Sequence, residues 1–333
     1  MNSIIRPRRL RRTEAIREMV RENHLKTSDF IYPLFIHEKD IKEEITAMPG
    51  TYRWDINGLI KEVTRAWELG IRCVVLFPKI NDSLKTEDGA ECFNEDGLIP
   101  KAIRILKKEI PEMAIMTDVA LDPYSCDGHD GLVDETGKIL NDETIEILKK
   151  QALTQANAGA DFIGPSDMMD GRVGAIRTAL DSEGFNDVGI ISYTAKYSSA
   201  YYGPFRTALD SAPRENSKKI IPDNKSTYQM DPANSKEALI ESALDQYEGA
   251  DILMVKPGIS YLDIVYRLST FSNKPIAAYN VSGEYSMVKS AAMKNWINEK
   301  DIVLETLLSF KRAGAKLILT YHACDASQWL QDT

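Results

Sequence analysis

One pattern recurs four times along this 333-residue chain: an amphipathic stretch, then a glycine, then a short apolar run. Glycine adopts the left-handed backbone conformation that often ends a helix. A short run that is apolar throughout is typical of a strand buried on both faces of a parallel sheet. The pattern therefore predicts repeated helix–strand units. Its four copies are residues 67–78, 158–165, 248–257 and 313–321.

Further apolar runs raise the number of predicted strands to eight. They are residues 30–36, 114–120, 188–193 and 275–281. Periodic helical stretches lie between the strands, including residues 59–69, 142–158, 235–247, 261–271 and 301–313. Alternating strands and helices predict right-handed βαβ units, and eight units predict an α/β fold that closes into a (β/α)8 TIM barrel. The alternative is a doubly wound open sheet, but no GxGxxG motif follows the first strand to favour its dinucleotide-binding form.

Two segments are expected outside the regular barrel of residues 30–333. Residues 1–29 precede the first strand and carry five arginines between positions 6 and 12. We interpret them as an extended N-terminal arm that contacts a neighbouring subunit, with a solvated arm as the alternative. The longest connection, about residues 209–231, follows the fifth strand. A long loop at the C-terminal face of a barrel is typical of an active-site lid.

Composition excludes several classes of partner. The net charge of −9 argues against nucleic acid, because binding phosphates requires a basic surface. No run approaches the roughly 20 apolar residues of a membrane span, and no apolar signal segment follows the N-terminal arginines. The four cysteines lie far apart without CxxC spacing, which fits a reducing compartment. The expected location is the cytoplasm, or the plastid stroma if a transit peptide has been removed.

Two lysines are the strongest candidates for catalysis. The active site of a barrel lies where its strands end, and Lys196 and Lys256 follow the fifth and sixth predicted strands. Most lysines are solvated, but Lys256 continues a buried apolar run. Burial and a second nearby ammonium both lower the pKa of a lysine, and a neutral lysine amine forms Schiff bases with ketones. Two lysines permit two covalent ketone adducts at once.

A keto-acid substrate would also need a pocket for its carboxylate. Arg206 can supply a bidentate clamp. Ser282 and Tyr321, which follow the last two strands, can supply hydroxyl donors on the other side. The residues alone lead to two lysines and a hydroxyl pocket, and they leave the identity of the substrate open.

Six stretches resemble the porphobilinogen synthase (5-aminolevulinate dehydratase) family. They are residues 6–12, 165–173, 193–206, 228–234, 249–258 and 278–284. The resemblance implies a lyase of tetrapyrrole biosynthesis that condenses two molecules of 5-aminolevulinate into porphobilinogen with loss of two waters. It also implies a homo-oligomer, usually an octamer built from dimers that embrace through their arms.

The resemblance further implies a role for individual residues. Lys196 would bind one substrate molecule and Lys256 the other. Arg206, Lys225 and Gln229 would bind the carboxylate of the first molecule, and Ser282 and Tyr321 that of the second. The family usually has arginine where this chain has Lys225, and lysine keeps the charge but loses the planar fork. The lining of the site would consist of Asp118, Ser166, Tyr202, Phe205 and Tyr279.

The metal ligands depart from the zinc-using members of the family. Those members carry three cysteines after the third strand, at positions that are Ala120, Asp122 and Asp130 here. A zinc site of three thiolates is therefore absent, and we expect no zinc. Carboxylates prefer magnesium, so Asp122 and Asp130 are candidate ligands for magnesium or a monovalent ion. A site rebuilt from Cys126 and His129 is the alternative.

A second metal position is expected away from the active site. Many family members bind an activating, allosteric magnesium through a glutamate fifteen residues before the second Schiff-base lysine. That position is Glu241 in this chain. The alternative interpretation of Glu241 is an exposed helix carboxylate.

Two other functions were weighed against this one. A class I aldolase-type barrel needs only one Schiff-base lysine and typically binds phosphate with a glycine loop after its last strands, whereas residues 320–325 contain no glycine. A non-catalytic barrel scaffold predicts the loss of a catalytic lysine, but both are present. The order of carbon–carbon and carbon–nitrogen bond formation stays open.

Overall fold

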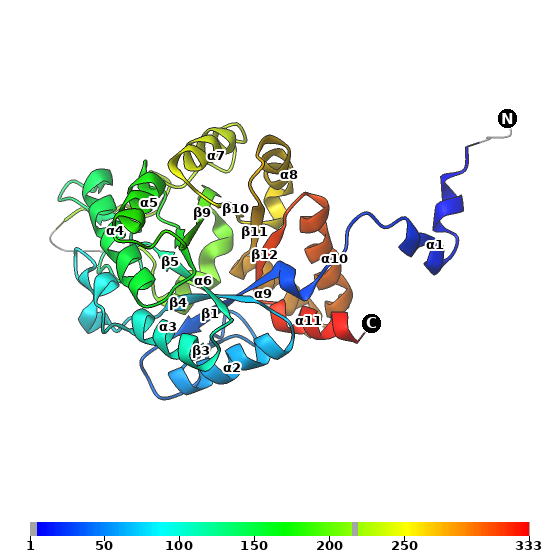
Figure 1. Ribbon diagram of the computed structural model, residues 1–333, viewed down its shortest axis with the longest axis horizontal. Coiled ribbons are helices and arrows are strands. Elements are labelled where there is room, and N and C mark those ends of the chain that lie inside the picture. The colour runs from blue at the N-terminus through cyan, green and yellow to red at the C-terminus, as the bar shows by residue number, and fades with distance from the viewer. Residues whose placement is uncertain (1–4, 215–218, 333) are drawn as a thin grey trace.

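A computed structural model describes residues 5–214 and 219–332, and eight parallel strands form its centre (Figure 1). Each strand pairs with the next, and the last pairs again with the first, where Phe30 lies opposite Ile318. The closed barrel confirms the predicted fold class, and the open-sheet alternative is wrong because no barrel edge is left free. The strands are β1 (Phe30–Ile36), β4 (Cys73–Pro78), β5 (Ala114–Val119), β8 (Phe162–Pro165), β9 (Gly189–Lys196), β10 (Ile252–Lys256), β11 (Ile276–Asn280) and β12 (Leu317–Thr320).

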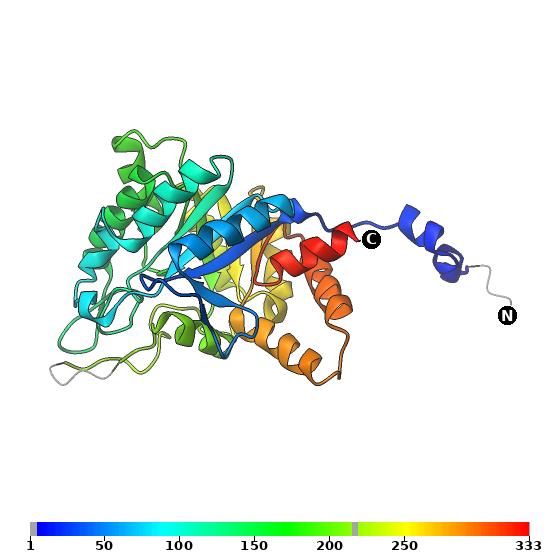
Figure 2. The same cartoon turned by 90° about the horizontal axis from the view of Figure 1, so that it is seen from below.

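Helices surround the barrel, as Figures 1 and 2 show. They include α2 (Ile56–Glu68), α3 (Leu98–Glu109), α4 (Asn141–Asn157), α5 (Arg172–Ser182), α7 (Glu237–Glu248), α8 (Leu262–Phe271), α10 (Glu299–Arg312) and α11 (Ala323–Gln331). Two others, α6 (Gly203–Leu209) and α9 (Ser282–Met293), follow β9 and β11 and pack against each other. The recurring glycine has its predicted role: Gly249 ends α7 with a φ of 107°, and β10 follows at once.

The barrel has two apolar layers, and side chains alternate between them along each strand. In β10, Ile252 and Met254 belong to the cluster inside the barrel, while Leu253 and Val255 pack outward against the helices. The period of two places the next residue, Lys256, in the interior. By the same count Asp118 and Tyr279 follow the interior residues of β5 and β11. Apolar residues therefore fill the barrel, and polar ones occupy its C-terminal end.

An irregularity in β9 changes this count. Ile191 pairs with Ile252, but Lys196 pairs with Lys256. Between these two pairs β9 advances by five positions, whereas β10 advances by four. The extra residue is a β-bulge, which re-aims the side chains beyond it. Ala195 consequently packs in the outer layer, and Lys196 takes the interior position. The bulge therefore places the two lysines side by side on the inner face of the barrel.

Several short elements lie outside the barrel. A hairpin of β2 (Glu43–Glu44) and β3 (Tyr52–Trp54) extends the sheet beside β1, and β6 (Leu132–Val133) pairs with β7 (Ile139–Leu140). The sequence pattern did not predict these strands, because runs of two or three residues show no periodicity. Short 3-10 turns occur at Thr27–Asp29, Asp82–Leu84, Ala90–Phe93, Ala200–Tyr202 and Ile259–Tyr261.

The N-terminal segment extends away from the barrel (Figures 1 and 2). It contains a 3-10 turn, Pro7–Arg11, and the helix α1 (Glu14–Met19), neither of which has a buried residue. The predicted arm includes residues 1–4 and the predicted lid includes 215–218, which lie outside the described residues, so both boundaries stay predictions. Of the helices that the structure describes, none has the length and apolar character needed to cross a membrane.

Candidate active site

Lys196 and Lys256 are the last residues of the neighbouring strands β9 and β10 and lie opposite each other in the register. They are 6% and 5% exposed. The two lysines therefore lie together at the C-terminal end of the barrel, where the sequence predicted them. We use the term two-lysine site for these lysines and the side chains that surround them.

Lys196 has polar surroundings. Its Nζ donates hydrogen bonds to Asp130 Oδ2, at 3.0 Å, and to the carbonyl of Ser166. Asp130 Oδ1 accepts a further bond from Lys225 Nζ at 2.8 Å, and the same Nζ lies 3.1 Å from Asp122 Oδ2. Burial alone would raise the pKa of Asp130, but the ammonium groups of Lys196 and Lys225 hold it well below its usual range.

Lys256 has aromatic surroundings. In the part of the chain that the structure describes, no carboxylate forms an ion pair with its Nζ. Burial, reinforced by the Lys196 ammonium, lowers the pKa of Lys256 to about 7, although the nearby Asp118 opposes the shift. Burial raises the pKa of Asp118 to about 6. The rings of four side chains lie 4.8–5.2 Å from Nζ: Tyr193, Tyr202, Phe205 and Tyr279.

The predicted hydroxyl pocket lies beside Lys256. The hydroxyls of Tyr279 and Tyr321 are 2.9 Å apart and joined by a hydrogen bond. Ser282 Oγ accepts a bond from the backbone N–H of Phe205 at 3.0 Å. The side chains of Tyr279, Tyr321 and Ser282 are buried. Ser282 and Tyr321, which the sequence placed after the last two strands, thus both belong to this pocket. The Tyr202 hydroxyl donates a hydrogen bond to the backbone carbonyl of Lys256 at 3.1 Å, which holds the Tyr202 ring against the end of β10.

Of the other residues assigned to the first substrate, Gln229 lies on the Lys196 side. Gln229 is buried, and its Nε2 lies 3.4 Å from Asp130 Oδ2. Arg206 is half-buried on α6, and its guanidinium makes no hydrogen bond or ion pair with any residue of 5–214 or 219–332. Burial raises the pKa of Tyr228 and of Tyr202, and the Arg206 guanidinium opposes both rises, so its charge acts on both sides of the site. An unpaired guanidinium is free to bind an anionic ligand.

The segment after β5 is built for ion pairs and hydrogen bonds. Both ring nitrogens of His129 are engaged, Nδ1 with the Tyr228 hydroxyl at 3.0 Å and Nε2 with a backbone carbonyl at 2.9 Å. Cys126 Sγ instead donates to its neighbour, Asp127. The two aspartates expected to hold a metal, Asp122 and Asp130, share the Lys225 ammonium. A metal ion here would have to displace that lysine.

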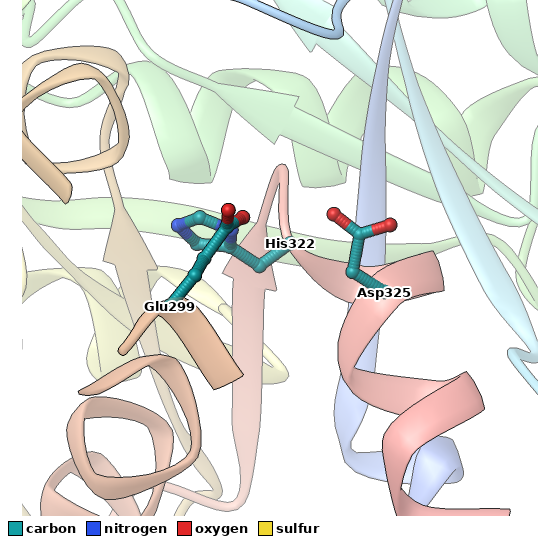
Figure 3. A group of neighbouring side chains, drawn as sticks. All are labelled: Glu299, His322 and Asp325. Atoms are coloured by element: carbon teal, nitrogen blue, oxygen red, sulfur yellow. The ribbon is translucent and has the colours of Figure 1, made fainter. Parts of the chain in front are cut away.

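A separate group of possible metal ligands lies outside the barrel (Figure 3). Within the described ranges, only Glu299, His322 and Asp325 bring three such ligand atoms within 4.8 Å of one another. The two carboxylates already have a cation, because Lys289 Nζ lies 2.5 Å from Glu299 and 3.2 Å from Asp325. We therefore assign no metal to this group.

Glu241 lies outside the two-lysine site, on α7. It lines a cavity of about 430 Å³ together with Asp170, Asp231 and Glu237. Burial, together with nearby carboxylates that include Asp170 and Glu237, raises the pKa of Glu241 to about 7. Tyr228 and Gln229 also line this cavity, so one short segment forms a wall of both sites.

Two features of the site were not predicted from the sequence. Asp130 was expected as a metal ligand, whereas in the structure it forms an ion pair with Lys196, 66 positions away in the chain. Glu284, which is buried at the start of α9, was not among the predicted site residues. The available signal was its place three residues after Val281, since a glutamate at the third position of a helix can accept from the backbone N–H before the helix.

Comparisons with known proteins agree on one family. A family model described as delta-aminolevulinic acid dehydratase matches residues 4–329. The chloroplastic delta-aminolevulinic acid dehydratase of Physcomitrium patens is 57% identical over 327 residues, which cover 98% of this chain and 74% of that protein. Its counterpart from Chlamydomonas reinhardtii is 56% identical over 328 residues, covering 98% and 84%.

A solved structure shows the same relationship. It is the crystal structure of delta-aminolevulinic acid dehydratase (porphobilinogen synthase) from Toxoplasma gondii ME49 in complex with the reaction product porphobilinogen. It is 51% identical to this chain, covers 100% of this chain and 93% of its own, and superposes with a TM-score of 0.97.

Proposed function

This chain belongs to the delta-aminolevulinic acid dehydratase family, and we propose that it binds one substrate on each of Lys196 and Lys256 as a Schiff base. It is a lyase of tetrapyrrole biosynthesis that condenses two molecules of 5-aminolevulinate into porphobilinogen. The family match excludes the aldolase-type enzyme and the inert scaffold. The observation that carries the proposal is that two buried lysines lie opposite each other on paired strands.

The two lysines differ in how they would reach the reactive state. A Schiff base forms when a neutral amine attacks the ketone carbon and the carbonyl oxygen leaves as water. A substantial fraction of Lys256 is uncharged at physiological pH, because burial lowers its pKa to about 7. Lys196 lies in an ion pair with Asp130, so its nitrogen must lose a proton before it can attack, and the ionised carboxylate of Asp130 holds the side chain in position.

The carboxylates of the two substrates would bind on opposite sides of the site. Arg206, whose guanidinium has no partner among residues 5–214 and 219–332, would bind the first carboxylate together with Gln229 and Lys225, which lie on the Lys196 side. Lys225 would share its ammonium between the substrate and its two aspartates. Ser282 and Tyr321 offer hydroxyls beside Lys256. The remaining lining residues are Asp118, Ser166, Tyr202, Phe205 and Tyr279.

Trapping with borohydride tests the two Schiff bases. Reduction during turnover converts each imine into a stable secondary amine, which peptide mapping by mass spectrometry assigns to a residue. We expect 5-aminolevulinate adducts on the peptides that contain Lys196 and Lys256. An adduct on only one of them, under conditions in which porphobilinogen forms, would show that the second lysine has another role.

We also propose that the segment of about residues 209–231 opens and closes over the two-lysine site. Both lysines are almost completely buried, so a substrate can reach them only if covering residues move. Lys225 and Gln229 belong to this segment and contact Asp130. Closure would therefore complete the Lys196 side of the site at the same moment as it excludes water.

Magnesium is the metal that we propose for this protein, bound at Glu241 and acting as an activator. The cavity there offers carboxylate and amide oxygens, which suit magnesium better than zinc. Burial is the main cause of the raised pKa of Glu241, with a smaller contribution from nearby carboxylates and an opposing one from the Arg172 guanidinium, and a cation bound in the cavity would favour the ionised carboxylate. Tyr228 and Gln229 line this cavity and also approach the two-lysine site, which gives a bound ion a route to influence activity.

Activity of metal-stripped enzyme tests the magnesium proposal. Adding back magnesium should raise the rate of porphobilinogen formation in the parent chain and in E305Q, which changes an exposed helix glutamate. In E241Q the response should disappear while the metal-free rate stays. Activity that returns only with zinc would contradict the proposal, and would indicate a metal site formed by Cys126, His129 and the aspartates.

For assembly and location, we propose a homo-octamer in the plastid stroma. Residues 5–29 contain no buried residue, and Leu10 and Met19 are exposed apolar side chains that a neighbouring subunit could cover. The relatives from Physcomitrium patens and Chlamydomonas reinhardtii are named as chloroplastic enzymes. This favours the plastid over the cytoplasm. The mass of the full chain in solution, compared with a chain lacking residues 1–29, tests the assembly.

A further inference from the structure

Glu284 is a buried carboxylate that contacts two of the loops of the two-lysine site. It lies in the first turn of α9 and is 3% exposed. One carboxylate oxygen, Oε1, accepts the backbone N–H of Ile259 at 2.7 Å. The other, Oε2, accepts the backbone N–H of Val281 at 2.9 Å and the side-chain amide of Asn280 at 3.1 Å. Both oxygens are therefore used as acceptors.

The donors belong to the segments that carry the Lys256 half of the site. Ile259 lies three residues after Lys256, in the turn that follows β10. Asn280 and Val281 separate Tyr279 from Ser282, at the end of β11. A single carboxylate thus fixes the position of the Lys256 turn relative to the Ser282 turn.

The same network continues to the last strand. The hydroxyl of Thr320 donates to Asn280 Oδ1 at 3.0 Å and accepts the backbone N–H of His322 at 3.2 Å. Thr320 ends β12 and precedes Tyr321. Glu284, Asn280 and Thr320 are all buried. They link the ends of β10, β11 and β12, and so connect Lys256, Ser282 and Tyr321 without contacting a substrate themselves.

We propose that Glu284 is a positioning residue that holds the second-substrate half of the site in register. This inference rests on the proposed function, in which Lys256, Ser282 and Tyr321 receive one of the two 5-aminolevulinate molecules. Burial raises the pKa of Glu284 to about 7, but the N–H groups of Ile259, Val281 and Asn280 donate to both oxygens and favour the ionised carboxylate. Buried hydrogen bonds to a charged acceptor are the stronger kind, and misplacing reacting groups by about 1 Å has large effects on rate. The Lys196 half lies outside the network, because its contacts run through Asp130 and Ser166.

The variant E284Q breaks the network with little change in shape. Glutamine has one acceptor oxygen, and its NH2 group would face a donor, so either Ile259 or the Val281–Asn280 pair loses its partner. Borohydride trapping over a range of 5-aminolevulinate concentrations measures the effect at each lysine. The concentration for half-maximal labelling of Lys256 should rise roughly 10-fold, while that of Lys196 should change less than about twofold.

Two further variants make the result decisive. T320V removes the distal hydroxyl at nearly constant shape and should shift the same lysine in the same direction by a smaller factor, which keeps the proposal testable if E284Q folds poorly. E143Q changes an exposed first-turn glutamate of α4, outside the network, and should leave both curves unchanged. Equal losses at Lys196 and Lys256, or unchanged labelling of Lys256 in E284Q, would overturn the proposal.

The design separates this proposal from the proposed function. If the parent chain makes porphobilinogen but is never labelled on Lys256, the assignment of two Schiff bases fails. The KM for product formation then decides the role of Glu284. A KM that rises roughly 10-fold in E284Q, with a smaller change in kcat, still supports positioning, whereas an unchanged KM contradicts it.

Discussion

Lys196 and Lys256 end neighbouring strands and face each other, but their surroundings are opposite in character. Lys196 lies among carboxylate, carbonyl and amide groups, with Asp130 at 3.0 Å. Lys256 lies among four aromatic rings. One lysine is therefore held as part of an ion-pair network, and the other loses its charge by desolvation. Two chemically identical amines in one site can thus be adapted to the same reaction in different ways, one by an ion pair and the other by burial among apolar rings.

The largest expected effect comes from removing either lysine. K256M and K196M should each lower the rate of porphobilinogen formation by roughly 1,000-fold or more, because a lost nucleophile is not replaced by its neighbours. The comparison is sharpened by trapping: K256M should still label Lys196 with 5-aminolevulinate. The exposed Lys101 offers the control variant K101M. If K256M retained near-parental activity, the aromatic surroundings would have no catalytic purpose.

Removing the charge of Asp130 should affect the polar half more than the aromatic half, where its carboxylate makes only a minor contribution to the pKa of Lys256. D130N leaves two buried ammonium groups without a shared partner, which should lower the free energy of unfolding by about 3 kcal/mol. The rate should fall roughly 100-fold, as expected when the group that holds the Lys196 amine in position is lost. Denaturant unfolding and trapping at each lysine measure both effects. Labelling that fell more on Lys256 than on Lys196 would break the division into two halves.

The pH profile tests the aromatic half. Since the pKa of Lys256 is lowered to about 7, the amine is neutral above that pH and protonated below it. The rate should therefore fall as pH decreases below about 7, approaching tenfold per pH unit. The carboxylate of Asp118 raises the pKa of Lys256, so D118N should move this limb to lower pH by roughly one unit. A limb that moved to higher pH would contradict the assignment.

The smallest expected effect concerns Lys225. Arginine has a planar fork that can bind an aspartate and a substrate carboxylate together, whereas one ammonium must be shared. K225R should lower the KM for 5-aminolevulinate by roughly two- to fivefold, within the value of a single charged hydrogen bond. Steady-state kinetics measure this change. An unchanged or higher KM would contradict this role of Lys225. It would mean that the site between Asp122 and Asp130 suits lysine at least as well as the arginine that is usual in the family.

The barrel and its two lysines were predictable because their signals are local. A glycine before an apolar run marks β4, β8, β10 and β12, and the lysines follow their strands directly. The ion pairs were not predictable, since Lys225 and Asp122 are 103 residues apart. A carboxylate that follows a strand resembles a metal ligand and an ion-pair partner equally well. Only the folded chain shows which cation it contacts.

The network around Glu284 illustrates a second limit. A glutamate at the third position of a helix was visible as a capping signal. Its contact with Ile259, by contrast, depends on two loops meeting across the barrel rim. Residue types and spacing therefore identify groups that react, whereas groups that hold them in place become visible through the packing of distant segments.

The extra residue in β9 has a consequence for anyone who transfers this chemistry to another scaffold. Along a regular pair of strands, the positions of Lys196 and Lys256 have opposite parity, so one amine would point into the barrel and the other toward the helices. A designed barrel that copied the two lysines without the bulge would separate the nucleophiles by the thickness of its own wall. The one-residue offset in β9 is thus as much a part of the transferable unit as the amines.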